Sequence, residues 1–130
     1  MLTKDPKQTN YNPIIYLTLY PKLLEIAQEC GYNLAVHGSM QRDFDMVAIP
    51  WVQNCTTSIV LISKLSQWLK GKIEAPDFAK EKPHGREPWV IHIEEGKYLD
   101  ISVITPRPEL YNENAIEVIL TTQKYLYDNE

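Results

Sequence analysis

Two acidic residues in one strand-like run could bind a metal ion. Asp43 and Asp45 flank Phe44 in a stretch rich in β-forming residues. Residues i and i+2 of a strand project from the same face, so the two carboxylates would lie side by side with Phe44 buried opposite. A divalent cation relieves the repulsion between like charges, and Mg²⁺, or Mn²⁺ in its place, prefers such oxygen ligands. Two solvated acids on an exposed strand are the alternative interpretation.

A third carboxylate, Asp100, interrupts the apolar run 98–103. Leu99 and Ile101 share one face of this predicted strand, so Asp100 projects from the other. If the strand lay beside the one that holds Asp43, three carboxylates would meet in one place. Such a cluster is typical of metal-assisted phosphoryl transfer. Otherwise Asp100 simply faces solvent.

A glycine-serine pair precedes the two acids. Gly38 lets the backbone approach a phosphate closely, and the Ser39 hydroxyl can bond a phosphate oxygen. An ordinary turn is the alternative interpretation. Arg42 and Arg86 could grip a phosphate with their planar guanidinium groups, although Arg86 is also compatible with a surface ion pair. His37 either contacts a ligand or is a structural, hydrogen-bonded histidine.

In this order, these residues resemble the nucleotidyltransferase superfamily with its polymerase β-like fold. That family shows a hydrophobic-Gly-Ser turn, an acid-x-acid strand and a third acid on a later strand. The resemblance spans about residues 20–105, and it rests on stretches 36–39, 43–46 and 99–101. With stretches 48–51, 82–86 and 98–103, the chain is most similar to small phage-encoded members of unassigned function.

The resemblance implies transfer of a nucleoside monophosphate from a nucleoside triphosphate (NTP) to an unknown acceptor. The catalytic, metal-binding residues would be Asp43, Asp45 and Asp100, and the metal Mg²⁺ or Mn²⁺. The residues implied to bind the nucleotide phosphates are Gly38, Ser39, Arg42 and Arg86.

The sequence departs from the family between the Gly-Ser pair and the acids. Only residues 40–42 intervene, whereas active members have a longer segment that forms part of the phosphate cradle. A second hypothesis is therefore a catalytically inactive nucleotide- or protein-binding module of phage origin. A third is a partner in a larger complex that supplies the missing parts.

Composition predicts one soluble domain without extended nucleic-acid binding. The chain has 130 residues, of which 44% are hydrophobic and 23% charged, and its formal net charge is −4. We expect a flexible N-terminus over residues 1–12 and a single domain over 13–130. A negative chain is disfavoured as a general binder of phosphate backbones. Cys30 and Cys55 lack motif spacing, and neither a signal peptide nor a membrane segment is evident, so the expected location is cytoplasmic, in the host for a phage-encoded chain.

The hydrophobic pattern predicts an α/β (α+β) fold, a minimal nucleotidyltransferase-like mixed sheet packed with helices. Pro21 suits the first turn of a helix, so we expect a helix over about 21–30, with an earlier helical turn over 14–19. An antiparallel strand pair is expected over 32–40 and 43–49, and a hairpin over 89–93 and 98–104. The remaining expected elements are a helix from about 56 to 70, a long loop over 72–87 and a last helix over 114–127.

Overall fold

The structure, a computed structural model, describes residues 12–78 and 85–105. These residues form two α-helices and five strands, so the predicted α+β class is confirmed. The elements follow the chain as α1 (Asn12–Glu29), β1 (Tyr32–His37), β2 (Asp43–Pro50), α2 (Ser58–Leu69), β3 (Lys72–Glu74), β4 (Arg86–His92), the 3₁₀ helix η2 (Glu94–Gly96) and β5 (Tyr98–Ile104).

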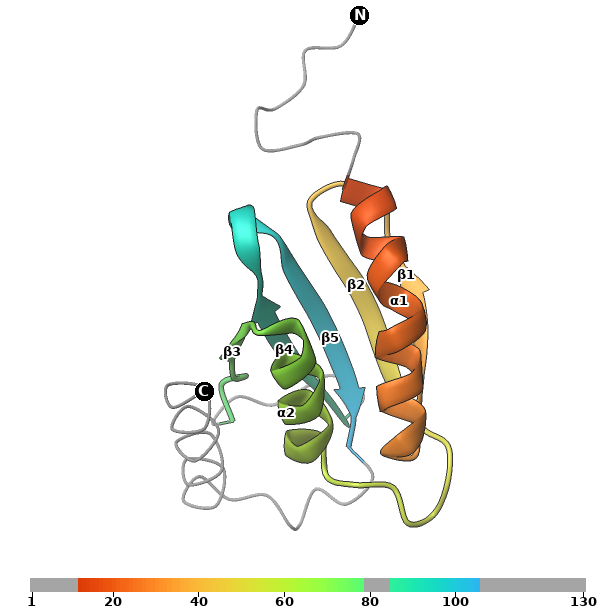
Figure 1. The fold of residues 1–130 in the computed structure, drawn as a ribbon. Coiled ribbons are helices and arrows are strands. Elements are labelled where there is room, and N and C mark those ends of the chain that lie inside the picture. Colours follow the sequence, from red (N-terminus) through yellow and green to blue (C-terminus); the bar gives the residue numbers. More distant parts are fainter. Residues whose placement is uncertain (1–11, 79–84, 106–130) are drawn as a thin grey trace, which may run out of the picture.

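The strands form one mixed sheet in the order β1-β2-β5-β4-β3 (Figure 1). The central strands β2 and β5 pair in parallel, and every other neighbouring pair is antiparallel. Both the predicted β1–β2 unit and the predicted β4–β5 hairpin are therefore confirmed. The parallel pair places Asp43 beside Tyr98, so segments far apart in the sequence meet at the centre of the sheet.

Both helices cover the same face of the sheet (Figure 1). Alternate residues of β2, β4 and β5 point toward the helices and are buried, which is the period of two expected for strands with one buried face. The opposite face, which we call the second face, carries the intervening residues of each strand. The core between sheet and helices includes Tyr16, Leu23, Phe44, Met46, Leu61, Ile62, Leu65, Trp89, Ile91, Leu99 and Ile101.

The expected start of the first helix at Pro21 is wrong, because α1 continues through this residue. Proline lacks the N–H that would bond to the carbonyl of Leu17, four residues earlier. Pro21 and Leu17 are both exposed, so water can satisfy that carbonyl. The helix therefore tolerates a proline that the sequence pattern places at a boundary.

Asn12 corrects the expected boundary of the flexible N-terminus. It is the first residue of α1, it is buried, and its Nδ2 donates to the Gln41 carbonyl oxygen at 2.5 Å. Residues 1–11 lie outside the described part of the chain. A tertiary hydrogen bond thus orders a position whose local sequence predicts a loose end.

The expected loop over residues 72–87 is also wrong in part. Residues Lys72–Glu74 form β3, which pairs with β4, and β4 already begins at Arg86. Pairing with a distant strand gives this charged segment a hydrogen-bonded ladder that its own composition does not predict. The first strand ends at His37, before the residue 40 expected from the sequence. The expected helix over 114–127 lies outside the described residues.

The second helix matches its prediction closely. The Thr57 side chain accepts a hydrogen bond from the Val60 N–H at the N-cap, and Lys70 ends the helix in the left-handed conformation. Gly31 ends the first helix with a φ of +88°, as expected for a glycine C-cap. Among the described residues, no helix is long and apolar enough to cross a membrane.

Candidate metal centre

The first two carboxylates of the centre are placed by the alternation of β2. Phe44, between them, is fully buried and stacks on Tyr16 of α1 with ring centroids 5.3 Å apart. Because neighbouring residues of a strand face opposite ways, Asp43 and Asp45 must both project from the second face. The packing of one aromatic ring thus fixes the direction of two acids.

The third carboxylate comes from the parallel neighbour. Asp100 of β5 lies directly opposite Asp45 in the register, with Leu99 opposite Phe44. The three side chains can each offer one oxygen so that these oxygens all lie within 4.8 Å of one another. The structure therefore brings together the three acids that the sequence singled out.

Mutual repulsion and burial make this cluster unfavourable without a cation. Burial raises the pKa of Asp45 to about 6, helped by a hydrogen bond that the protonated Asp45 carboxyl donates to Asp43 and by the charges of Asp43 and Asp100. Burial also raises the pKa of Asp100, together with the charges of Asp43 and Glu74. His37 acts in the opposite direction on both groups. A hydrogen bond between two carboxyl groups requires one shared proton, which a bound cation would displace.

Gly38 lies against the Asp45 carboxylate. Its φ is +81°, and a Cβ at this position would stand 2.8 Å from Asp45 Oδ2. The preceding residue, His37, is the register partner of Asp45 across β1 and β2. The sequence interpreted this glycine as a phosphate contact, and the structure adds a second reason for it, which is room for a carboxylate.

The short connection between β1 and β2 is anchored to α1. Ser39 Oγ accepts a hydrogen bond from the Gln41 N–H at 3.3 Å. The Gln41 carbonyl accepts from Asn12, and the Arg42 carbonyl accepts from the Tyr16 hydroxyl at 2.6 Å. These contacts hold the turn beside the acids. The sequence analysis did not identify Asn12 or Tyr16 as residues that anchor this turn. Their polar side-chain groups were the one feature that could have indicated the role.

Two residues beside the acids differ in how the sequence treated them. Tyr98 is the register partner of Asp43, and burial raises the pKa of its hydroxyl, with contributions from Asp43, Asp100 and Asp45. Arg42 lowers that same pKa, so its positive charge reaches this part of the second face. The sequence predicted Arg42 but missed Tyr98, although alternation within β5 places Tyr98 on the same face as Asp100.

Arg86 does not join the cluster. It pairs with Ile104, whereas Asp100 pairs with Val90 four positions away along β4 and β5. At about 3.3 Å per residue, this places Arg86 roughly 13 Å along the sheet from the acids. A role for Arg86 beside the phosphates is not favoured by this register.

Comparison with family models, with curated proteins and with solved structures gave no match. The geometry itself defines the class: an α+β domain that presents three carboxylates from two parallel central strands on one face of a mixed sheet.

Proposed function

We propose that the chain is a nucleotidyltransferase-like protein that transfers a nucleoside monophosphate from an NTP to an acceptor hydroxyl in the presence of Mg²⁺ or Mn²⁺. One observation carries the proposal, the meeting of Asp43, Asp45 and Asp100 with oxygens within 4.8 Å of one another. These acids come from strands that pair only through the tertiary fold.

The donor set fits a hard divalent cation. All three groups offer carboxylate oxygens, which Mg²⁺ and Mn²⁺ prefer, and three acids leave coordination positions for phosphate oxygens. A bound cation neutralises charge on the attacking and leaving oxygens of a phosphoryl group. The proton that Asp43 and Asp45 share would leave when the cation binds, because the metal ligands must be ionised.

The neighbouring residues would bind the nucleotide. The Gly38–Ser39 turn offers backbone N–H groups, and the Ser39 hydroxyl can donate to a phosphate oxygen while it accepts from Gln41. Arg42 adds a positive charge beside the acids. Positioning and electrostatic stabilisation supply most of the catalysis in phosphoryl transfer, so this reaction does not depend on a dedicated general base.

A second candidate is a binding module that keeps the fold without the transfer chemistry. Two observations favour it. The turn between β1 and β2 has few residues to surround a triphosphate, and Arg86 lies far along the sheet. Such a module would bind a nucleotide or a protein partner. For both candidates we propose a cytoplasmic location, which is the host cytoplasm if the chain is phage-encoded.

Thermal denaturation with each NTP, with and without Mg²⁺, tests the proposed site. We expect that NTP and Mg²⁺ together stabilise the wild type by more than the sum of either alone, and that this extra stabilisation is absent in Asp45→Asn. Glu29→Gln, which removes one exposed acid from α1, is the matched control and should respond like the wild type. No stabilisation by any NTP would contradict the proposed site.

Pyrophosphate release then separates the two candidates. Metal-dependent release from one NTP, absent in Asp45→Asn, would support the enzyme. Nucleotide binding without release, across a panel of hydroxyl-bearing acceptors, would favour the module.

A further inference from the structure

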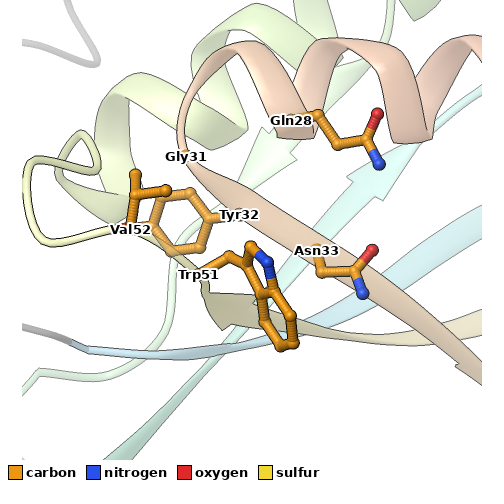
Figure 2. Close-up of a pocket in the computed structure, with 6 residues that line it drawn as sticks. All are labelled: Gln28, Gly31, Tyr32, Asn33, Trp51 and Val52. Atoms are coloured by element: carbon orange, nitrogen blue, oxygen red, sulfur yellow. The ribbon is translucent and has the colours of Figure 1, made fainter.

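A pocket beside the exposed indole of Trp51 lies at the other end of the β1–β2 pair from the three acids. The Trp51 side chain is 73% exposed and the neighbouring Val52 is 47% exposed. They border a pocket of about 330 Å³ (Figure 2). That volume falls at the lower end of small-ligand sites. The pocket is lined by Gln28, Gly31, Tyr32, Asn33, Trp51 and Val52.

The wall that carries the indole is firmly attached to the rest of the protein. The Trp51 N–H donates to the Gly31 carbonyl at 2.8 Å, and the Thr56 N–H donates to the Cys30 carbonyl at 2.9 Å. The Tyr32 hydroxyl donates to the Thr56 carbonyl at 2.5 Å. The loop 51–56 is therefore held against the α1–β1 turn at both ends. A ligand that covers the indole at this fixed position would gain the free energy of burying its apolar surface.

Gly31 makes this attachment sterically feasible. A Cβ there would lie 2.7 Å from Val52 Cγ2 and 2.8 Å from the Cys55 Cα. Only a glycine allows the loop to lie so close to the turn while keeping a φ of +88°. The pocket is thus formed before any ligand arrives, which lowers the entropy lost on binding.

The polar groups of the pocket point to a ligand with a hydrogen-bonding edge. Asn33 Oδ1 accepts from the Leu34 N–H at 3.1 Å, so its amide NH₂ is the group left to donate to a ligand. Gln28 offers a carboxamide oxygen and an NH₂ side by side from the end of α1 (Figure 2). None of the lining residues that the structure describes is charged, which favours a neutral ligand portion.

A peptide strand is a poor fit for this edge. The Leu34 N–H on the edge strand β1 is already bonded to Asn33, and its carbonyl accepts from the Tyr20 hydroxyl at 2.8 Å. Strand addition needs these main-chain groups to be available. A flat ring that stacks on the indole and bonds to carboxamides does not use them.

We propose that this pocket binds a purine base and prefers adenine to guanine. The indole of Trp51 supplies a stacking surface, and stacking on an aromatic side chain suits any base. The paired acceptor and donor of Gln28 match the amino group and N7 of adenine, whereas guanine presents two acceptors on that edge. The NH₂ of Asn33 donates to a further ring nitrogen or to the sugar.

This base site is separate from the metal centre. Tyr32 and Pro50 are register partners near the pocket, and His37 and Asp45 are partners near the acids, five positions away. At about 3.4 Å per residue, the two sites are roughly 17 Å apart along the sheet. The base site therefore requires neither the metal nor the proposed transfer activity.

Titration with adenosine in the presence of EDTA tests the proposal without phosphates or metal. The readout is the backbone N–H resonances of Gly31, Asn33 and Val52 in two-dimensional NMR, which every variant keeps, with the Kd taken from their shifts. We expect saturable binding that weakens about 5- to 150-fold in Trp51→Ala, the range of base-stacking contributions. Trp51→Phe, which keeps a ring, should retain part of the affinity. Trp68→Ala removes another exposed indole, 40% exposed on α2, and should bind like the wild type.

The remaining variants separate base recognition from the metal centre. Gln28→Ala should weaken adenosine binding about five-fold or more and leave weak uridine binding unchanged. Asp45→Asn should bind adenosine normally, so failure of the proposed transferase leaves this test intact. A trinucleotide of adenosine that binds more tightly, with a strong salt dependence, identifies a nucleic-acid strand as the source of the base, and equal or weaker binding identifies a free nucleoside. No saturable shift up to the solubility limit of adenosine, or equal affinity in Trp51→Ala, would overturn the proposal.

Discussion

Replacing Asp45 by asparagine should make the metal-free protein more stable at neutral pH. The folded chain holds this carboxyl at a pKa of about 6, against an ordinary value of 3.8, chiefly because it is partly buried and beside Asp43 and Asp100. Below 3.8, the carboxyl is protonated in both the folded and the unfolded chain. As the pH rises from 3.8 to 6, only the unfolded chain readily releases the proton, so the free energy of unfolding falls. Asparagine stays neutral throughout and avoids this loss.

The magnitude follows from the two pKa values. Their difference corresponds to about 3 kcal/mol at about 1.4 kcal/mol per unit. Asp45 is partly exposed, and solvent screening reduces the expected gain to about 1–2 kcal/mol. For a domain of this size, that gain raises the Tm by about 3–8 °C. The amide also keeps a donor for the Asp43 carboxylate, so the hydrogen bond between the two side chains can persist.

Thermal denaturation followed by circular dichroism, with EDTA present, measures this gain. Asp45→Asn should exceed the wild type at about pH 7.5 and match it near pH 4, because the aspartate is then neutral as well. Glu29→Gln makes the same change of charge at an exposed site of α1 and should match the Tm of the wild type at both pH values. Equal Tm values at neutral pH, or the same gain at both pH values, would refute the electrostatic reasoning.

Three further outcomes are expected. Stabilisation by Mg²⁺ or Mn²⁺ should decline below about pH 6, because the metal must displace the proton from Asp45, and calorimetric titration across pH checks this. Gly38→Ala should destabilise the chain by about 1–3 kcal/mol and weaken metal binding, because the added Cβ would lie 2.8 Å from Asp45 Oδ2. Gly96→Ala is the control: Gly96 has a similar φ of +72°, but a Cβ there would have no atom within 4 Å, so this change should affect stability alone. Glu87→Ala should lower the free energy of unfolding, measured by urea denaturation, by about 1–3 kcal/mol. The buried Trp89 Nε1–H, which donates to Glu87 Oε1 at 3.2 Å, would lose its acceptor. Glu87→Gln keeps an acceptor and should lower the free energy of unfolding less.

Local patterns in the sequence predicted much of the sheet. The alternation of apolar and polar residues along β2 predicted that Asp43 and Asp45 project from the same face, opposite Phe44. The same alternation along β5 predicted that Asp100 projects opposite Leu99 and Ile101. The hairpin and the β1–β2 unit follow from short connections between β-rich segments. What the sequence could not decide was the parallel pairing of β2 with β5, because no local signal specifies which distant strands become neighbours.

Other features depend on tertiary contacts that local patterns do not contain. Pro21 lies inside α1 because its side of the helix meets water, and β3 exists because β4 lies beside it. Arg86 looked equivalent to Arg42 as a phosphate ligand, yet the register carries it far along the sheet. The pocket beside Trp51 requires the loop to lie against Gly31, a contact that no spacing rule predicts.

Counting bound Mn²⁺ by electron paramagnetic resonance tests the central claim most directly, since free Mn²⁺ gives a strong signal that binding removes. The proposed centre predicts that the wild type removes Mn²⁺ from solution without NTP, and that with NTP it removes more Mn²⁺ than the NTP alone does. Asp45→Asn and Asp100→Asn should lose this binding, and Glu29→Gln should keep it. If the wild type and both aspartate variants leave the same free Mn²⁺ signal, the three carboxylates do not form a metal centre.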